Sequence, residues 1–252
     1  LEDVRILQAR SRQEKLAAMG RVSAGVAHEI RNPLTAIAQA NALLSEDVRD
    51  PAQRQLMQMV TDNVQRLKRI VDDVMAVSPG QVHDVHPIDA TAQVGAVCRE
   101  WALAAGMTVG EQGQLELHLP GEALGVLFDA EHLRRVLVNL LDNARRHASQ
   151  AIGAIDVRLD SRDETRVFLS VSSDGASIPA DVERYLFEPF FSTRSRGTGL
   201  GLYICRELCE RYGASIEYRP RPAAERLRNE FLVSMRRVAL SGAVPVLPLD
   251  TA

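Results

Sequence analysis

Two stretches of the sequence repeat apolar residues every three or four positions, and this repeat limits the possible folds more than any other feature. The first stretch runs from Met19 to Leu44 and the second from Leu56 to Val77. Such a near-heptad repeat predicts two helices that each pack along one side against other helices. The stripe positions are Met19, Ser23, Val26, Ile30, Pro33, Ile37, Ala40 and Leu44 in the first helix, and Leu56, Val60, Asn63, Leu67, Ile70, Val74 and Val77 in the second.

A break at Ser45 to Pro51 separates the two predicted helices. Asp50 precedes a proline, which disfavours continued helix, and Pro51 is suited to the first position of a new one. A single helical hairpin cannot bury both stripes, whereas two paired hairpins form a four-helix bundle, so we expect a homodimer. Asn63 lies on the second stripe, where a polar residue more often fixes the register of the helices than performs chemistry.

His28 lies off the first stripe, about 200° around the helix from it. A lone histidine on a polar helix face is most often simply solvated, but the neighbours of His28 favour a chemical role. Glu29 can hold the imidazole ring or accept its proton. Asn32 follows one turn later on the same side, and Pro33 removes a backbone donor and loosens the helix. The pattern indicates a histidine that is offered to a partner outside the bundle.

The segment from His28 to Leu34, HEIRNPL, resembles the phosphoacceptor motif of sensor histidine kinases, His-Glu-x-x-Asn-Pro-Leu. The resemblance implies that His28 receives a phosphoryl group and that Glu29 orients its ring. It also implies that Asn32 can orient a water molecule for dephosphorylation of a partner. A kinase of this kind requires a nucleotide site elsewhere in the chain.

Composition restricts the class of protein further. The 252 residues suffice for one or two domains, and a net charge of -3 provides no basic field for nucleic acid. No apolar run approaches the roughly 20 residues of a membrane-spanning helix. Because the sequence starts at Leu1 without a methionine, we expect a cytoplasmic piece of a longer protein, whose upstream part would carry any sensor domain or inner-membrane anchor. Cys98, Cys205 and Cys209 are interpreted as ordinary helix residues in a reducing compartment.

After Ser78, Pro79 and Gly80, the pattern changes from long helices to interspersed strands and helices. Helices are predicted over residues 89–105, 131–147 and 200–212. Strands are predicted over 115–119, 125–129, 155–159, 167–172, 215–218 and 231–236. Because the order shows no regular βαβ repetition, we expect an α/β sandwich with a mixed sheet and helices on one face.

The predicted helix over 131–147 carries two asparagines one turn apart, Asn139 and Asn143, beside its apolar side. Two helical asparagines are often surface residues, but neutral amide oxygens at this spacing can also hold a hydrated Mg²⁺ ion. The segment NLLDNARRHA resembles the asparagine box of histidine kinases. The resemblance implies Asn143 as the direct Mg²⁺ ligand, Asn139 as its partner, and Arg146 or His147 as phosphate contacts.

A glycine-rich segment directly before a predicted helix provides the second nucleotide signal. Alternate glycines let backbone N–H groups approach an anion closely at a helix start. Together with FEPFF upstream, the segment resembles the lid and second glycine box of histidine kinase ATP-binding domains. The resemblance implies that Phe187, Pro189 and Phe190 anchor the lid. It also implies that the arginines of the lid contact phosphate, although exposed loop arginines usually make no measurable contribution. The implied nucleotide contacts are Phe187, Phe190, Thr193, Arg194, Gly197, Thr198, Gly199, Leu200, Gly201 and Leu202.

The first glycine box departs from the family pattern Asp-x-Gly-x-Gly-Ile-Pro, in which the aspartate accepts a hydrogen bond from adenine. Aligned on Gly175 and Ile178, the chain has Ser173 at the aspartate position and Ser177 at the second glycine. Asp174 stands one residue later, and a shift of one residue at a strand end reverses the direction of a side chain. Either Ser173 faces adenine as a weaker acceptor, or a bulge turns Asp174 toward it.

The resemblance covers about residues 16–237. Within the family, the chain loosely resembles the branch of nitrogen-regulation and pilus-regulation sensors. It implies a signal-transmitting helix (1–18), a dimerisation and histidine phosphotransfer domain (19–80), a linker (81–88), an ATP-binding catalytic domain (89–238) and a tail (239–252). It further implies Mg²⁺-ATP held between the asparagine helix and the glycine-rich lid. The phosphoryl group would pass to His28 and then to an aspartate of a response regulator receiver domain. Alternatives are a phosphatase-dominant or scaffold-like homologue with weakened ATP use, and an ATPase of the wider superfamily.

Overall fold

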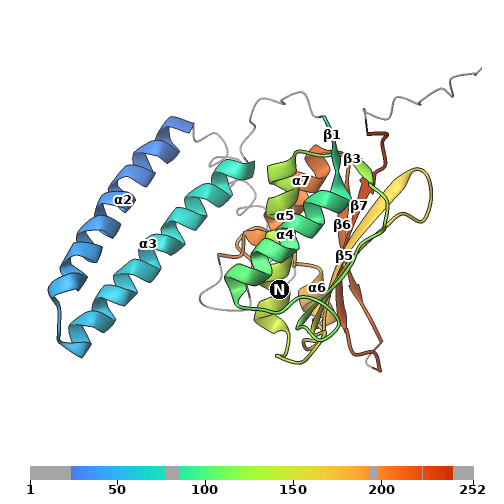
Figure 1. The fold of residues 1–252 in the computed structure, drawn as a ribbon. Helices are drawn as coiled ribbons and strands as arrows, with labels where there is room; N and C mark the ends of the chain where they lie inside the picture. The colour runs from blue at the N-terminus through green and yellow to red at the C-terminus, as the bar shows by residue number, and fades with distance from the viewer. Residues whose placement is uncertain (1–23, 78–85, 193–197, 223, 241–252) are drawn as a thin grey trace, which may run out of the picture. The chain divides into compact units, whose positions relative to one another are not determined.

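The computed structural model describes residues 24–77, 86–192, 198–222 and 224–240, without the side chains of residues 24–28 and 76–77 (Figure 1). The chain divides into two compact units, one built on the N-terminal helices and one on a sheet. Each is described by itself. The predicted signal-transmitting helix over 1–18 and residues 241–252 of the predicted tail lie outside the described residues.

The N-terminal helices are α2 (Ala24–Asp47) and α3 (Pro51–Val77), joined by a short connector. Asp50 ends the connector, and its Oδ1 accepts a hydrogen bond from the backbone N–H of Ala52 at 3.0 Å. This is the contact of a helix N-cap, with Pro51 at the first helical position. The predicted break and the helical hairpin are therefore confirmed.

A small set of side chains is buried between α2 and α3. Leu34, Val64 and Val74 retain between 5% and 7% of their exposure. Asn41 is also buried, and its Nδ2 donates to the Met57 carbonyl and to Thr61 Oγ1, both at 2.9 Å. A paired amide in an apolar contact fixes one register of the two helices.

Asn63 does not have this role between α2 and α3, and a register role between two copies of the chain stays a prediction. Asn63 is exposed, and its Nδ2 donates to the carbonyl of Met59 in the same helix at 2.7 Å. A bond within one helix places no constraint on the other. Asn41, which the stripe analysis passed over, links the two helices instead.

Most of the predicted stripe residues stay exposed on the hairpin. Ile37, Leu56 and Leu67 retain 46%, 61% and 47% of their exposure. The same holds for Ile30, Leu44 and Val60. Apolar side chains at this density on both helices form an apolar face, and its burial against another apolar surface would be favourable.

The second unit contains a five-stranded sheet in the order β2-β4-β5-β7-β6. The strands are β2 (Leu115–His118), β4 (Ile155–Asp160), β5 (Arg166–Ser173), β6 (Ser215–Pro220) and β7 (Asn229–Arg236). β2 runs parallel to β4, and the other neighbouring pairs are antiparallel. A parallel pair requires a long crossover connection, which here contains a helix. The predicted mixed sheet is confirmed.

Helices α4 (Ala90–Ala105) and α5 (Ala130–His147) lie together on one face of this sheet, and no described helix covers its other face (Figure 1). The apolar side of α5 and the facing side chains of the sheet are buried to 5% exposure or less. They include Leu133, Val136, Leu137, Leu140, Leu141, Ala144, Ile155, Val157, Leu169, Val171 and Val233. This layer is the core that fixes α5 against the central strands.

Two short elements differ from the sequence prediction. Strand β1 (Pro87–Asp89) pairs with β3 (Gly125–Leu127), so the predicted linker over 81–88 ends before Pro87. The short helix α6 (Ala180–Glu183) was not predicted. Asp89 caps α4 through a bond from the N–H of Ala92 to its Oδ1 at 3.1 Å, so the helix predicted over 89–105 begins at this residue's cap.

Two further expectations concern membrane-spanning helices and the three cysteines. No helix in the described part of the chain is long and apolar enough to cross a membrane. The three cysteines are buried side chains, and burial raises the pKa of the Cys98 and Cys209 thiols to about 12. Neutral buried thiols act as small apolar residues, as the sequence predicts.

Candidate functional site

His28 belongs to the first turns of α2, and its side chain lies outside what the structure describes. Glu29 and Asn32 are exposed on the same helix, and Leu34 turns into the hairpin. Pro33 lies inside the helix, as predicted. The backbone thus places Glu29 and Asn32 in solvent beside the position of His28.

One ion pair ties this part of α2 to α3. Arg31 Nη2 lies 2.7 Å from Asp72 Oδ1, and both side chains are 46% exposed. An ion pair this exposed is screened by solvent and adds little to stability. It nevertheless restrains α2 in the segment that follows His28.

The two asparagines lie on α5, which begins at a cap made by Asp129. Asp129 Oδ1 accepts from the N–H groups of Glu131 at 3.0 Å and His132 at 2.9 Å. Asn139 and Asn143 are half-buried beside the apolar side of the helix. Their amide oxygens, one turn apart on a rigid helix, suit a cation that also contacts phosphate oxygens.

The residues near these asparagines differ in their contacts and exposure. Asp142 Oδ1 accepts from Trp101 Nε1 at 2.9 Å, which fastens α5 to α4. Arg146 is exposed, and its Nη2 lies 3.8 Å from Asp142 Oδ2. His147 is exposed at the last residue of α5. Arg146 and His147 are thus in solvent one turn beyond Asn143, where a phosphate contact is geometrically possible.

Ser173 and Asp174, the two candidates for the adenine acceptor, differ clearly in their contacts. Ser173 is the last residue of β5 and is 6% exposed. It follows Val171 by two positions and therefore points to the face that α5 covers. Asp174 instead accepts two bonds from Ser149, one from the backbone N–H at 2.8 Å and one from the hydroxyl at 2.5 Å. These bonds use both Asp174 carboxylate oxygens to close the turn after α5.

The loop after Ser173 approaches α5 closely. A Cβ atom on Gly175 would lie 2.5 Å from the carbonyl oxygen of His147, a distance that real Cβ atoms do not reach. Only glycine fits there. The first glycine box therefore packs its backbone against the end of the helix that carries Asn139 and Asn143, and Ile178 follows it half-buried.

Two residues that the sequence analysis missed hold this loop from the other side. Asn229 is 4% exposed, and its Nδ2 donates to the carbonyls of Gly175 at 3.0 Å and Ala176 at 3.2 Å. Tyr218 completes the link, because its hydroxyl donates to Asn229 Oδ1 at 2.8 Å and accepts from the N–H of Ile178 at 3.3 Å. The sequence offers only a weak signal for these two residues, namely a single asparagine at the first position of the apolar strand β7.

The lid segment is described in part. Thr193, Arg194 and Gly197 lie outside the described residues. At its end, Thr198 and Gly199 are half-buried, Leu200 is buried, and α7 (Gly201–Arg211) begins with the half-buried Gly201 and Leu202. Gly199 has a φ of 68°, and a Cβ atom there would lie 2.5 Å from the Phe190 carbonyl carbon. Glycine is therefore required at this position.

The three predicted lid anchors differ in burial, and residues 193–197 of the lid lie outside the described residues. Phe190 is 36% exposed and has a φ of 59°, so its anchoring role stays a prediction. Pro189 is buried and Phe187 is half-buried, so both fit an anchoring role. Phe191 contributes as well, with its ring centroid 5.7 Å from that of Tyr185.

His132, near the start of α5, has a perturbed pKa. Burial lowers the pKa of its imidazole, and this outweighs the opposing effect of Asp129. The ring packs against Tyr212, with His132 Nδ1 2.5 Å from the tyrosine hydroxyl. Protonation of His132 therefore costs more in the folded protein than in the unfolded chain.

We expect this histidine to make the domain less stable in acid. The pKa of His132 is lower in the folded protein than in the unfolded chain, so the unfolded state binds more protons. The contribution of His132 to the free energy of unfolding is therefore present above the unfolded pKa of about 6.5 and is lost as the pH falls below it. His132→Gln should flatten the dependence of the unfolding free energy between pH 7.5 and 5.5. Urea denaturation at both pH values measures this, with the exposed His86→Gln as control. An unchanged slope in His132→Gln would contradict the assignment.

Comparison with known proteins agrees with this geometry. Residues 128–236 match the family of histidine kinase-, DNA gyrase B- and HSP90-like ATPases. Residues 18–81 match the His Kinase A (phospho-acceptor) domain. A helical hairpin with a phosphoacceptor match, followed by a sheet domain with an ATPase match, defines the catalytic core of a two-component sensor kinase.

The chain belongs to the sensor histidine kinases. It is 38% identical to the sensor protein kinase PilS of Pseudomonas aeruginosa over 226 residues, which are 88% of this chain and 42% of the relative. A solved structure of the histidine kinase ThkA in complex with response regulator protein TrrA is 27% identical, with a TM-score of 0.59 over 94% of this chain and 67% of that one.

A second structure, full-length ShkA in complex with AMPPNP, shares the fold. Its TM-score is 0.64 at 23% identity, over 90% of this chain and 47% of that one. The chain spans less than half the length of three curated relatives that it matches, between 33% and 45% of each. These relatives are therefore larger proteins that contain a region similar to this chain.

Proposed function

We propose that this chain is the catalytic core of an ATP-dependent protein-histidine kinase that phosphorylates His28. The observation that carries the proposal is the presence of both halves of such an enzyme in one chain. A hairpin that matches the phosphoacceptor family presents HEIRNPL, and a domain that matches the ATPase family presents the asparagine helix and glycine boxes. Either half alone would leave the function open.

The residues of the nucleotide domain fit Mg²⁺-ATP. Asn139 and Asn143 offer neutral oxygens at the spacing of one helical turn, and we propose Asn143 as the direct ligand. Bound Mg²⁺ neutralises charge on the phosphate oxygens during transfer. Arg146, His147 and Arg194 are proposed phosphate contacts, and Thr198, Gly199 and Gly201 offer backbone N–H groups at the start of α7.

The reaction forms a bond between a ring nitrogen of His28 and the γ-phosphorus, and it breaks the bond to the β-phosphate oxygen. ADP leaves. Glu29, the next residue on α2, holds or accepts the proton on the other ring nitrogen. Since His28 and the nucleotide residues belong to different domains, catalysis requires an arrangement of the two domains that brings them together. Most of the rate enhancement would come from positioning and charge neutralisation.

We further propose that the chain acts as a homodimer and passes its phosphoryl group to a receiver domain. The exposed apolar residues of α2 and α3 support the dimer, because a second copy would bury them in a four-helix bundle. The ThkA structure, solved with response regulator protein TrrA, supports a receiver domain as partner. In the cell the chain would lie in the cytoplasm, with any membrane anchor in the rest of a longer protein.

Transfer to a receiver domain tests the proposed function directly. The chain is incubated with γ-labelled ATP and Mg²⁺, separated from nucleotide, and mixed with a purified receiver domain. We expect label to leave the chain and appear on the receiver, but not on a receiver whose acceptor aspartate is replaced by asparagine. Label that stays on the chain with every receiver tested would contradict a phosphotransfer role.

The adenine acceptor gives a second, independent prediction. With Asp174 bound to Ser149, Ser173 is the residue we propose to face adenine. Since charge-assisted bonds are roughly twice as strong as neutral ones, Ser173→Asp should tighten ATP binding by about 1 kcal/mol, roughly fivefold in Kd. Preference over GTP should increase as well.

The matched variant is Asp174→Ala, which should leave the Kd for ATP nearly unchanged. It should lower the unfolding free energy by about 1 kcal/mol, because the bonds to Ser149 are lost. Titration of both variants with ATP and GTP distinguishes the registers. Loss of ATP binding in Asp174→Ala, with no gain in Ser173→Asp, would show that Asp174 faces the base.

A further inference from the structure

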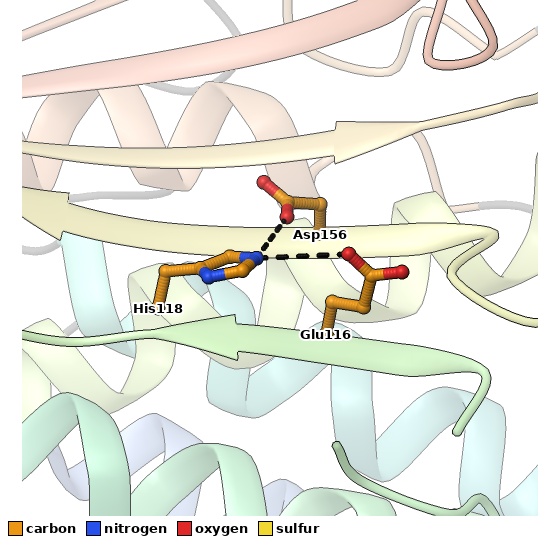
Figure 2. Close-up of side chains that lie close together, drawn as sticks. All are labelled: Glu116, His118 and Asp156. Atoms are coloured by element: carbon orange, nitrogen blue, oxygen red, sulfur yellow. Dashed lines mark ion pairs between the residues drawn. The ribbon is translucent and has the colours of Figure 1, made fainter. Parts of the chain in front are cut away.

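The helix-free face of the sheet carries a cluster of metal-ligating side chains that the kinase site does not use. Strands β2 and β4 are parallel neighbours, and Glu116 pairs with Asp156 in their register. Alternate residues of a strand share a face, so His118 lies on the same face as Glu116. The cluster therefore consists of Glu116 and His118 from the edge strand and Asp156 from the next strand (Figure 2).

Three atoms of this cluster converge on one point. His118 Nε2 lies 2.9 Å from Asp156 Oδ2 and 3.6 Å from Glu116 Oε2. One ligand atom from each residue lies within 4.8 Å of the other two. The carboxylate of Asp156 is embedded in the sheet at 1% exposure, whereas the histidine side chain is 49% exposed. A cation could therefore enter from the solvent side, past the imidazole.

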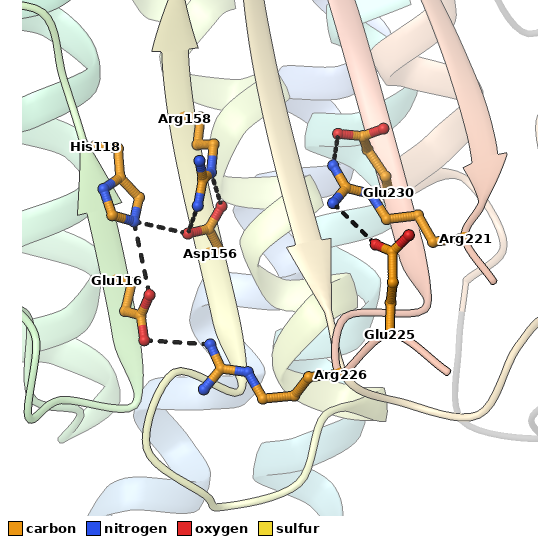
Figure 3. Close-up of polar contacts among 8 residues, drawn as sticks. All are labelled: Glu116, His118, Asp156, Arg158, Arg221, Glu225, Arg226 and Glu230. Atoms are coloured by element: carbon orange, nitrogen blue, oxygen red, sulfur yellow. Dashed lines mark hydrogen bonds and ion pairs between the residues drawn. The ribbon is translucent and has the colours of Figure 1, made fainter. Parts of the chain in front are cut away.

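Two arginines contact the carboxylates of the cluster (Figure 3). Arg158 Nε donates to Asp156 Oδ1 at 2.7 Å, with a longer contact of 3.3 Å from Nη2 to Oδ2. Arg226 Nη2 donates to Glu116 Oε1 at 3.2 Å, and its Nη1 bonds the carbonyl of Ile152 at 3.0 Å. Glu116 thus directs its second oxygen, Oε2, toward His118, whereas Asp156 Oδ2 contacts both Arg158 and His118. Partners of this kind fix the orientation of metal ligands.

Ser172 provides an independent observation on the same face of the sheet, on the strand that follows β4 in the sheet order. It pairs with Asp156 across β4 and β5, so its side chain lies on the face that carries Asp156. It is 1% exposed, and its hydroxyl has no hydrogen-bond partner among the described residues. A buried polar group without a partner is costly, and such groups frequently indicate a bound water or ion. A water molecule or ion bound on this face would supply that partner.

We propose that Glu116, His118 and Asp156 form a binding site for a divalent transition-metal cation, with Zn²⁺ as the best fit. One imidazole and two carboxylates are a ligand set that zinc accepts, with a water molecule in the fourth position. Mg²⁺ prefers oxygen ligands in octahedral geometry and fits this set poorly. Binding would join the edge strand β2 to β4 and stabilise the folded domain. The proposal does not depend on the kinase reaction.

Titration with Zn²⁺ tests the site on the full chain, free of tags, nucleotide and other metals. Calorimetry should show one equivalent bound per chain at this site, and the Tm should rise with Zn²⁺ concentration. MgCl₂ should neither reproduce the rise nor compete. Wild-type protein whose Tm and heat of titration do not respond to Zn²⁺ would overturn the proposal, and the cluster would then be an ordinary ion-pair network.

Two variants separate this site from binding elsewhere. His118→Ala should weaken Zn²⁺ binding at least tenfold. Glu116→Gln should also weaken Zn²⁺ binding, and this substitution preserves the shape of the side chain and hence the fold. The exposed His86→Ala is the matched control and should bind as the wild type does. Equal Zn²⁺ affinity in the wild type, His118→Ala and Glu116→Gln would overturn the assignment, because the ion would then be bound by other residues.

Discussion

His28→Ala is expected to abolish covalent labelling of the chain by γ-labelled ATP, a loss limited only by the detection of the assay. Alanine has no nucleophilic nitrogen, and no other residue follows the HEIRNPL pattern in this sequence. Because His28 lies off the apolar stripe, the dimer and ATP affinity should be unchanged. Size-exclusion chromatography with light scattering and an ATP titration measure these two properties.

A matched replacement makes this result specific. His86→Ala removes an exposed histidine outside the proposed site and should keep full labelling. Labelling of His28→Ala at another residue would refute the phosphoacceptor assignment. Dissociation of the His28→Ala dimer would instead show that His28 is part of the helix interface.

Asn143→Ala should remove Mg²⁺-dependent ATP binding, with a loss of at least about tenfold in affinity, or about 1.4 kcal/mol. The effect on folding should be small, since replacement of a partly exposed polar residue usually changes stability by about 0.5 kcal/mol or less. Calorimetric titration with Mg²⁺-ATP and a thermal melt of the nucleotide-free protein separate the two quantities.

The neighbouring Asp142→Ala is the informative control for Asn143→Ala. Asp142 accepts the indole N–H of Trp101, so its loss should cost about 1 kcal/mol of stability and leave ATP affinity unchanged. The two variants should therefore show opposite patterns. A large fall in Tm for Asn143→Ala without nucleotide would make Asn143 structural and contradict its role as a metal ligand.

The sequence predicts the existence and order of most elements because their patterns are local. The stripes of α2 and α3, the cap at Asp89 and the long amphipathic α5 follow from spacings within one helix. Which stripe residues contact the neighbouring helix is a different matter. Leu34 and Asn41 face α3, whereas Ile37 and Leu44 remain exposed, and both sets recur at helical spacing. Periodicity alone cannot separate a side that packs within the hairpin from one available to a second chain.

The candidate site was predictable where motifs are contiguous and was missed where distant segments meet. Asn143, Gly175 and Gly199 stand in recognisable motifs, and the structure gives both glycines a steric reason. Tyr218 and Asn229, which hold the first glycine box, come from strands β6 and β7. Their role depends on strand pairing, which single-residue patterns do not encode. The same holds for the contact between Asp174 and Ser149, which supports the proposal that Ser173 rather than Asp174 faces adenine.

The central claim is that this chain transfers the γ-phosphoryl group of ATP to His28. It is tested most directly by incubating the chain with Mg²⁺ and ATP labelled in either the γ or the α position, followed by mass spectrometry of the modified peptide. We predict that only the γ label is incorporated, that the bond is stable in alkali and broken by acid, and that the phosphate is on His28. Hydrolysis of ATP without incorporation would instead identify an ATPase, and absence of both, with receiver binding retained, would identify a scaffold.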